Sequence, residues 1–209
     1  MKHMKSIRKL CYVALVVSMT LAPSGSKAQI TLDSYFNVDW QFNVPIDNNF
    51  SSVASGWGMN FEGGYYVTQD IAVGAFISFH TNNEYFPRHT ISLSPTLSMN
   101  SDQQHQMFTL PFGALLRYRF IEADFQPYAG IKLGACYAEF NDYYYIFMSG
   151  QDRWGFHVSP EVGFNWYPWP NGIGLHMAVY YSYSTNSCNI MSYKQDGLNN
   201  FGARLGIAF

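Results

Sequence analysis

The chain ends in the segment Phe201-Gly-Ala-Arg-Leu-Gly-Ile-Ala-Phe209, and this segment decides the fold. Every second residue from Phe201 to Phe209 is apolar, whereas the residues between them are small or, at Arg204, charged. Successive side chains of a β-strand point to opposite faces, but a helix of this sequence would scatter its apolar residues around the circumference. The segment therefore predicts a strand with one apolar and one polar face.

The same alternation recurs seven times upstream, so eight strands are predicted in total. They cover residues 35–42, 57–67, 71–79, 109–120, 129–137, 156–166, 173–183 and 201–209. Ten residues at about 3.3 Å each, tilted by roughly 40°, span close to the ~25 Å apolar band of a membrane barrel. The strand lengths therefore suit a sheet that crosses a membrane.

The links between these strands alternate in length. Residues 68–70, 121–126 and 168–171 are short turns, whereas residues 43–56, 80–106, 141–153 and 185–199 are long. In an antiparallel meander this alternation places all long links at one end. We therefore expect an all-β, eight-stranded antiparallel up-and-down transmembrane β-barrel. Residues 91–99 alternate weakly and either extend the flanking strands or add a ninth, which would break the alternation.

The first 28 residues read as a secretory signal peptide. Four basic residues precede an apolar run of about a dozen residues, which is shorter than the ~20 of a membrane-spanning helix. Small residues at Ser26 and Ala28 place the cleavage after Ala28, so that residues 29–209 form the barrel domain.

The remaining charge excludes one class of partner. Removal of the signal leaves seven basic and fourteen acidic residues, a net charge of −7. A nucleic-acid partner is not expected, because phosphate binding needs basic clusters. Two cysteines, Cys136 and Cys188, remain in the mature chain, and the sequence leaves open whether they pair.

The charged residues of the strands decide which face meets lipid. An up-and-down barrel can also be a soluble, lipocalin-like ligand carrier with its apolar face inside. Here nearly every charged residue of the strands lies on the same face as the glycines. Small glycines suit the narrow lumen of an eight-stranded barrel, so this face is expected to point inward. We expect a luminal ion-pair network in which Arg204 lies beside Asp39 and Glu62, Lys132 faces Glu161, and Arg117 and Arg119 lie just below. In a barrel this narrow, the network is expected to be a structural plug and not an ion path.

The chain resembles the small outer-membrane barrels of the OmpA transmembrane-domain and OmpX type. The resemblance rests on the eight strands, the long links at one end and the final Leu205, Ile207 and Phe209, which look like a C-terminal signal for the barrel-assembly machinery. It implies an exported outer-membrane protein, expected as a monomer, with periplasmic termini and with contacts to outer-membrane lipid and lipopolysaccharide.

No motif for chemistry stands out in the sequence. No phosphate loop, HExxH or CxxC occurs, and no cofactor or metal site is expected. The outward strand positions carry no Ser, His, Asp or Glu, which disfavours a lipid A-modifying barrel enzyme. We expect a non-enzymatic protein with a structural or surface-interaction role through its long extracellular loops.

One loop carries a candidate contact patch, formed by Tyr143, Tyr144, Tyr145 and Phe147. An exposed apolar patch of this kind is typical of contact with another protein, such as a surface or host partner, or with lipopolysaccharide. Alternatively, the same residues prolong the flanking strands into a barrel rim.

Overall fold

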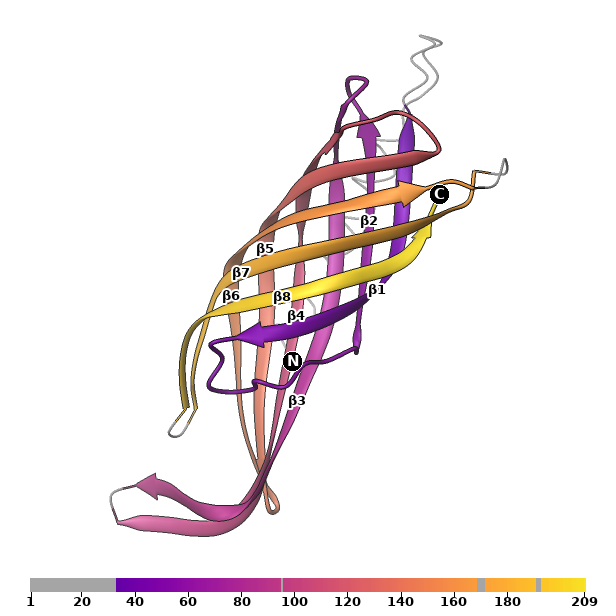
Figure 1. Ribbon diagram of the computed structural model, residues 1–209. Coiled ribbons are helices and arrows are strands. Elements are labelled where there is room, and N and C mark those ends of the chain that lie inside the picture. The colour runs from indigo at the N-terminus through magenta and orange to yellow at the C-terminus, as the bar shows by residue number, and fades with distance from the viewer. Residues whose placement is uncertain (1–32, 95, 169–171, 191–192) are drawn as a thin grey trace, which may run out of the picture. The chain divides into compact units, whose positions relative to one another are not determined.

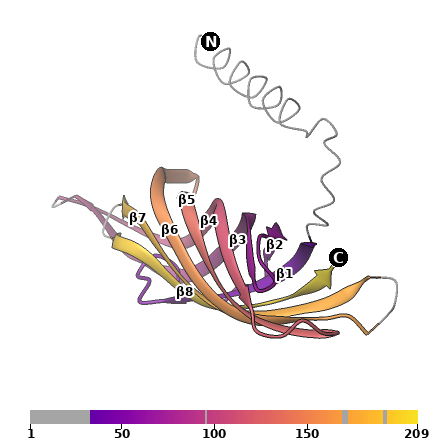
Figure 2. The same ribbon diagram turned by 90° about the horizontal axis from the view of Figure 1, so that it is seen from above.

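Eight antiparallel strands form a closed barrel (Figure 1). The computed structural model describes residues 33–94, 96–168, 172–190 and 193–209, so the expected signal peptide at residues 1–28 lies outside them. The strands are β1 (Ser34–Ile46), β2 (Gly58–Tyr66), β3 (Ile71–Ser94), β4 (Leu97–Arg119), β5 (Phe125–Tyr144), β6 (Phe147–Trp166), β7 (Gly174–Ile190) and β8 (Tyr193–Ala208). Each strand pairs with its neighbour in sequence, and the strands follow one another around a curved sheet (Figure 2). The predicted all-β class and strand number are confirmed.

The two terminal strands close the barrel. β1 and β8 pair in antiparallel register from Asn37 opposite Ala208 to Ile46 opposite Asn199. The backbones of Phe36 and Phe209 exchange two hydrogen bonds, of 3.0 and 2.8 Å. The ladder thus has no open edge at this seam, which matters because an unpaired backbone group in hydrocarbon costs several kcal/mol.

Three of the four long links are mostly strand, so the strands are longer and the loops shorter than the alternation predicted. The β3–β4 ladder continues to the pair Ser94–Leu97, the β5–β6 ladder to Tyr144–Phe147, and the β7–β8 ladder to Ile190–Tyr193. Backbone hydrogen bonds need no apolar alternation, so the ladders extend through polar sequence. Residues 91–94 lengthen β3, residues 97–99 lengthen β4, and the described residues of this stretch form no ninth strand. We call this end of the barrel the hairpin end and the opposite end, where β1 starts and β8 stops, the turn end (Figure 1).

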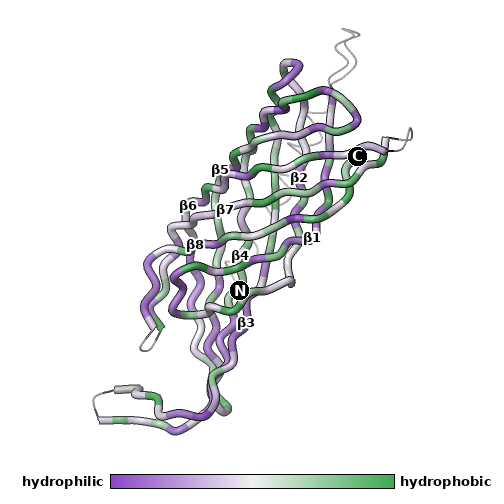
Figure 3. The backbone as a smooth tube through the Cα atoms, in the orientation of Figure 1, coloured by the Kyte–Doolittle hydropathy of each residue, from purple (hydrophilic) through white to green (hydrophobic). Residues whose placement is uncertain are grey.

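The two faces of the wall differ sharply in polarity. Large apolar side chains around the ring are exposed on its outer face. Hydrophobic and hydrophilic positions alternate along the strands (Figure 3). The inward positions include many buried polar residues, among them Asn37, Gln41 and Asn60. A barrel that is apolar outside and polar inside is the reverse of a soluble ligand carrier. Among the described residues, no helix is long and apolar enough to cross a membrane.

Candidate functional site: a charged network in the lumen and an apolar mouth

Glu62 on β2 is the first centre of the luminal charges. One of its carboxylate oxygens pairs with the guanidinium of Arg117 on β4, and the other pairs with the ammonium of Lys132 on β5. The side-chain amides of Asn37 and Asn60 donate to the same carboxylate at 2.9 and 3.3 Å. The Glu62 carboxylate is therefore surrounded by donors, which a buried carboxylate needs to stay charged.

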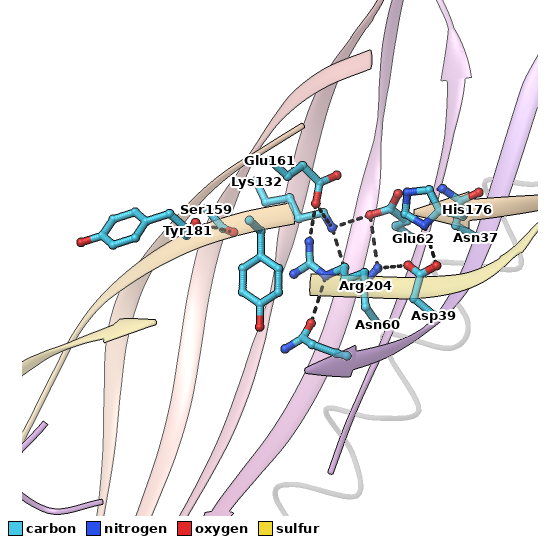
Figure 4. A network of polar contacts seen from close by, with 12 residues as sticks. Asn37, Asp39, Asn60, Glu62, Lys132, Ser159, Glu161, His176, Tyr181 and Arg204 are labelled. Atoms are coloured by element: carbon cyan, nitrogen blue, oxygen red, sulfur yellow. Dashed lines mark hydrogen bonds and ion pairs between the residues drawn. The ribbon is translucent and has the colours of Figure 1, made fainter. Parts of the chain in front are cut away.

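Glu161 on β6 is the second centre. Its carboxylate lies 2.8 Å from the Lys132 ammonium and also pairs with Arg204 on β8. The Arg204 Nε donates to the Gln41 side chain at 3.0 Å. Because Lys132 contacts both Glu62 and Glu161, the two centres form one network across the lumen (Figure 4).

Asp39 has a different partner from the one expected. Arg204 lies opposite Gln41 in the β1–β8 register, and Asp39 lies opposite Gly206, so the expected Arg204–Asp39 neighbourhood was wrong. Asp39 instead accepts hydrogen bonds from His176 on β7 at 2.5 Å and from Asn60 at 2.7 Å (Figure 4). A Cβ at residue 206 would collide with the Asp39 carboxylate, so glycine makes the space that this side chain occupies.

Arg119 lies outside the network, which corrects its expected place just below the other charges. Its guanidinium pairs with Asp33 at 3.0 Å and with Glu122 at 3.5 Å, and both carboxylates are more than half exposed. It also stacks over the ring of Tyr66, 4.0 Å from the ring centroid. The turn end of the barrel therefore has its own small ion-pair cluster, separate from the buried one.

Aromatic rings fill the space around the network. The Arg117 guanidinium lies between the rings of Tyr35 and Tyr128, at 3.9 and 3.6 Å from their centroids. Arg204 lies 4.1 Å from the centroid of Tyr180. Cation–π contacts of this kind are worth about 2 kcal/mol or more when desolvated. Side chains therefore occupy the lumen at this level.

A metal ion has no free ligands in this network. Asp39, Glu62 and His176 are the described residues whose ligand atoms come close enough to hold one, within 4.8 Å of each other. The two His176 ring nitrogens already contact Asp39 and the Tyr128 hydroxyl, and Lys132 neutralises Glu62. The existing partners satisfy these groups without a cation.

The link between β1 and β2 folds into the barrel at the hairpin end. Phe50 is fully buried and stacks on His105, with ring centroids 4.5 Å apart and planes 8° from parallel. It packs edge-on against Phe140 and joins an apolar cluster with Met107 and Leu198. We call residues 47–57 the cap, because Phe50 closes the mouth of the lumen from within.

A buried histidine and carboxylate hold the cap. The Nδ1 of His105 donates to the Phe50 carbonyl at 2.5 Å, so the opposite nitrogen, Nε2, faces an Asp142 oxygen at 3.5 Å. Within the described part of the chain, neither this nitrogen nor that oxygen has another hydrogen-bond partner, although Gln103 donates to the second Asp142 oxygen at 2.9 Å. Burial raises the pKa of Asp142. Two facing lone pairs repel, so a protonated Asp142, which can donate to this nitrogen, relieves the repulsion.

The candidate contact patch lies at the tip of the β5–β6 hairpin. Tyr143 and Tyr144 end β5, Phe147 begins β6, and Tyr145 lies in the turn with a positive φ of 52°. Tyr145 is 79% exposed and Ile146 is 77% exposed. The four predicted residues therefore both prolong the strands and form an apolar tip.

Cys136 and Cys188 are both buried and free. Cys188 on β7 belongs to the apolar cluster of the mouth, and the Sγ of Cys136 on β5 lies near the Tyr137 carbonyl at 3.7 Å. Both thiols pack as small apolar groups.

The sequence predicts the position of one further residue of the site and gives no indication of another. His176 alternates with outward residues, so the pattern already places it in the lumen, but only the register reveals Asp39 as its partner. Phe50 lies in a segment without periodicity, and no sequence signal marks it as buried.

Several known proteins and one protein family are similar to this chain. No curated protein matches the sequence. Solved structures that are similar include neisserial surface protein A (14% identity, 84% of this chain and 95% of that chain, TM-score 0.49) and the attachment invasion locus protein Ail of Yersinia pestis (17%, 84% and 97%, 0.44). The outer membrane protease OmpT of Escherichia coli is also similar (11%, 73% and 62%, TM-score 0.48). The family model "outer membrane protein beta-barrel domain" matches residues 11–209, so the chain belongs to this family of outer-membrane barrels.

Proposed function

We propose that this protein is a non-enzymatic outer-membrane β-barrel that acts at the cell surface through its hairpin end. The observation that carries the proposal is the combination of a closed interior with an exposed apolar tip. Charged and aromatic side chains fill the lumen, and Phe50 fills the mouth. The hairpins that surround this mouth are then the surface on which a partner can be recognised.

The tip of the β5–β6 hairpin is well suited to recognition. Its ladder is unbroken from Phe125–Trp166 to Tyr144–Phe147, so the backbone is ordered before any partner binds. Phe147 and Met148 are more than half exposed beside Tyr145 and Ile146. Rigid aromatic side chains lose little entropy on binding and are enriched in protein interfaces. We infer a partner with an apolar surface, either a protein of another cell or lipopolysaccharide.

The residues of the lipid-facing wall support the proposal that the protein is not an enzyme. Among the described outward residues of the apolar band, no Ser, His, Asp or Glu is present to act as a nucleophile or base. A lipid A-modifying enzyme would need such a group near the acyl or sugar bonds. Mass analysis of lipid A from wild-type and deletion cells checks this point, and identical species are expected.

The proposed location follows from the family and from the two ends of the chain. Residues 1–28 would direct export, and both termini would lie in the periplasm. Leu205 and Ile207 of β8 and Phe209, which follows this strand, are each about half exposed, so their side chains are accessible to the barrel-assembly machinery. Deletion of Phe209 is expected to reduce the amount of assembled barrel in outer-membrane fractions.

Site-specific photo-crosslinking tests the proposed surface role. A photoreactive phenylalanine analogue replaces Tyr145 at the β5–β6 tip, or Tyr85, 62% exposed on β3, as the matched control. We expect a crosslinked species from Tyr145 on intact cells that is lost when Phe147 and Met148 are changed to serine. Identical crosslinks from both positions, or channel conductance of the purified barrel in planar bilayers, would contradict the proposal.

A further inference from the structure

The outer wall has a hollow near the hairpin end, on the side formed by β1, β2 and β3. We call it the rim groove, and its volume is about 800 Å³. It is lined by Trp40, Gly56, Trp57, Met59, Phe79 and Thr81. Trp40 and Trp57 point outward and are 56% and 79% exposed. The rim groove therefore opens on the lipid-facing side of the barrel and is separate from the lumen.

The path of the backbone creates the hollow. The β1–β2 ladder ends at the pair Trp40–Met59, and beyond it the backbone of the cap pairs with β1 at the bridge between Asn43 and Ser55. Gly56 follows this bridge and contributes no side chain to the wall. A Cβ at Gly56 would lie 3.2 Å from the Phe42 ring, so a larger residue has little room there.

Hydrogen bonds fix the shape of the rim groove. The Trp40 indole N–H donates to the Gly56 carbonyl, and the Thr81 backbone N–H donates to the Trp57 carbonyl at 2.9 Å. The Trp40 and Phe42 rings also contact each other, with centroids 5.0 Å apart. The groove is therefore formed before any ligand arrives.

The position of the rim groove along the strands decides what can reach it. On β3 the outward residues Ile77 and Phe79 are apolar, Thr81 follows, and the next outward residue is the exposed Asn83. The apolar band thus ends at the height of Thr81, where the polar region of a membrane leaflet begins. The groove lies at the depth of the hydrocarbon chains just below the lipid headgroups.

We propose that the rim groove binds one hydrocarbon chain of a membrane lipid in the leaflet that meets the hairpin end. The lining is apolar, except for Thr81 and the Gly56 carbonyl that Trp40 already occupies. Water would find too few polar partners there, and an empty hollow would forfeit dispersion contacts along its walls. No charged residue lines the groove, so it recognises the chain and not a particular headgroup.

Brominated lipids test this site, because bromine quenches tryptophan fluorescence on contact. The groove reporter keeps Trp40 and Trp57 and carries Trp154→Phe, Trp166→Phe and Trp169→Phe. The control reporter keeps only Trp154, which is 66% exposed on β6 and packs on Tyr137 with centroids 5.3 Å apart. Both barrels are placed in phosphatidylcholine vesicles with an increasing fraction of lipid dibrominated midway along one chain.

At a low fraction of brominated lipid, we expect the fluorescence of the groove reporter to be quenched at least about twice as strongly as that of the control. Its quenching should also reach a plateau at a lower fraction of brominated lipid. Adding Thr81→Phe fills the groove and should reduce its quenching to the control level, whereas Ala135→Phe on β5 should not. Equal quenching of both reporters at every fraction would overturn the proposal. So would loss of quenching at high protein density together with a crosslinked dimer, because a second copy would then cover the groove.

Discussion

Replacing Glu62 with glutamine removes the carboxylate that Arg117 and Lys132 share. Lys132 keeps Glu161 at 2.8 Å, but Arg117 loses the carboxylate with which it pairs. The Nε and Nη1 atoms of Arg117 already lack hydrogen-bond partners among the described residues. An uncompensated buried charge costs about 3–5 kcal/mol. The rings of Tyr35 and Tyr128 still stack on the guanidinium and offset part of this cost. We therefore expect Glu62→Gln to lower the free energy of unfolding by about 3 kcal/mol.

A double-mutant cycle separates the charge from the packing. Arg117→Met keeps most of the side-chain volume between the two tyrosines. It also removes the positive charge that Glu62→Gln leaves without a paired carboxylate. Replacing both partners of a buried pair is often nearly neutral, so the double variant should be at least about 2 kcal/mol more stable than the sum of the single changes. Urea unfolding in phosphatidylcholine vesicles, followed by tryptophan fluorescence, gives each free energy of unfolding.

The matched control is Lys194→Gln on β8. Lys194 pairs with Asp196 at 3.1 Å, but both side chains are about 70% exposed. Such a surface pair is worth about 0–1 kcal/mol. The reasoning is refuted if Glu62→Gln is no more destabilising than Lys194→Gln, or if the cycle shows no coupling between Glu62 and Arg117.

Three further changes probe the mouth and the thiols. Burial raises the pKa of Asp142, so the contribution of this residue to stability should fall as the pH rises from about 4 through the raised pKa. Asp142→Asn, whose side-chain amide can donate to His105, should make stability less dependent on pH. Unfolding measured from pH 4 to 8 checks this expectation. Phe50→Ala should speed proteolysis within the cap at least about tenfold, because losing a buried phenylalanine costs about 3–5 kcal/mol; an unchanged cleavage rate would mean that Phe50 does not hold the cap. Burial raises the pKa of the Cys188 thiol to about 11, so a maleimide should label Cys188 and Cys136 only after unfolding, and labelling of the folded barrel would contradict their burial.

The interior of the barrel has two unlike parts. At the level of Glu62 and Glu161 the lumen is held by charge pairs, whereas at the hairpin end Phe50, Met107 and Phe140 form an apolar core. Within the membrane, lipid surrounds the barrel, so its outward face must be apolar and its inward face can be polar. Beyond the membrane, the hairpins are surrounded by water, so their interior must supply an apolar core of its own.

Alternation along the chain was sufficient to determine the fold class, the number of strands and which residues face the lumen. A period of two is a local property, because each side chain takes its face from its neighbours along the same strand. The inward placement of Glu62, Lys132 and Arg204 follows from this property alone. The sequence was a poor guide to where strands end, because the ladders continue through polar residues as far as Tyr144 and Ile190.

The partners of the charges were decided only by the tertiary structure. Which residues meet across a lumen depends on the register of eight strands at once, and a shift of two residues preserves every face while changing every partner. This is why Arg204 lies opposite Gln41 and Asp39 contacts His176. For the same reason Arg119 pairs with Asp33 at the turn end and not with the network. Phe50 and the rim groove arise where the chain leaves the ladder, and no periodic pattern describes that stretch.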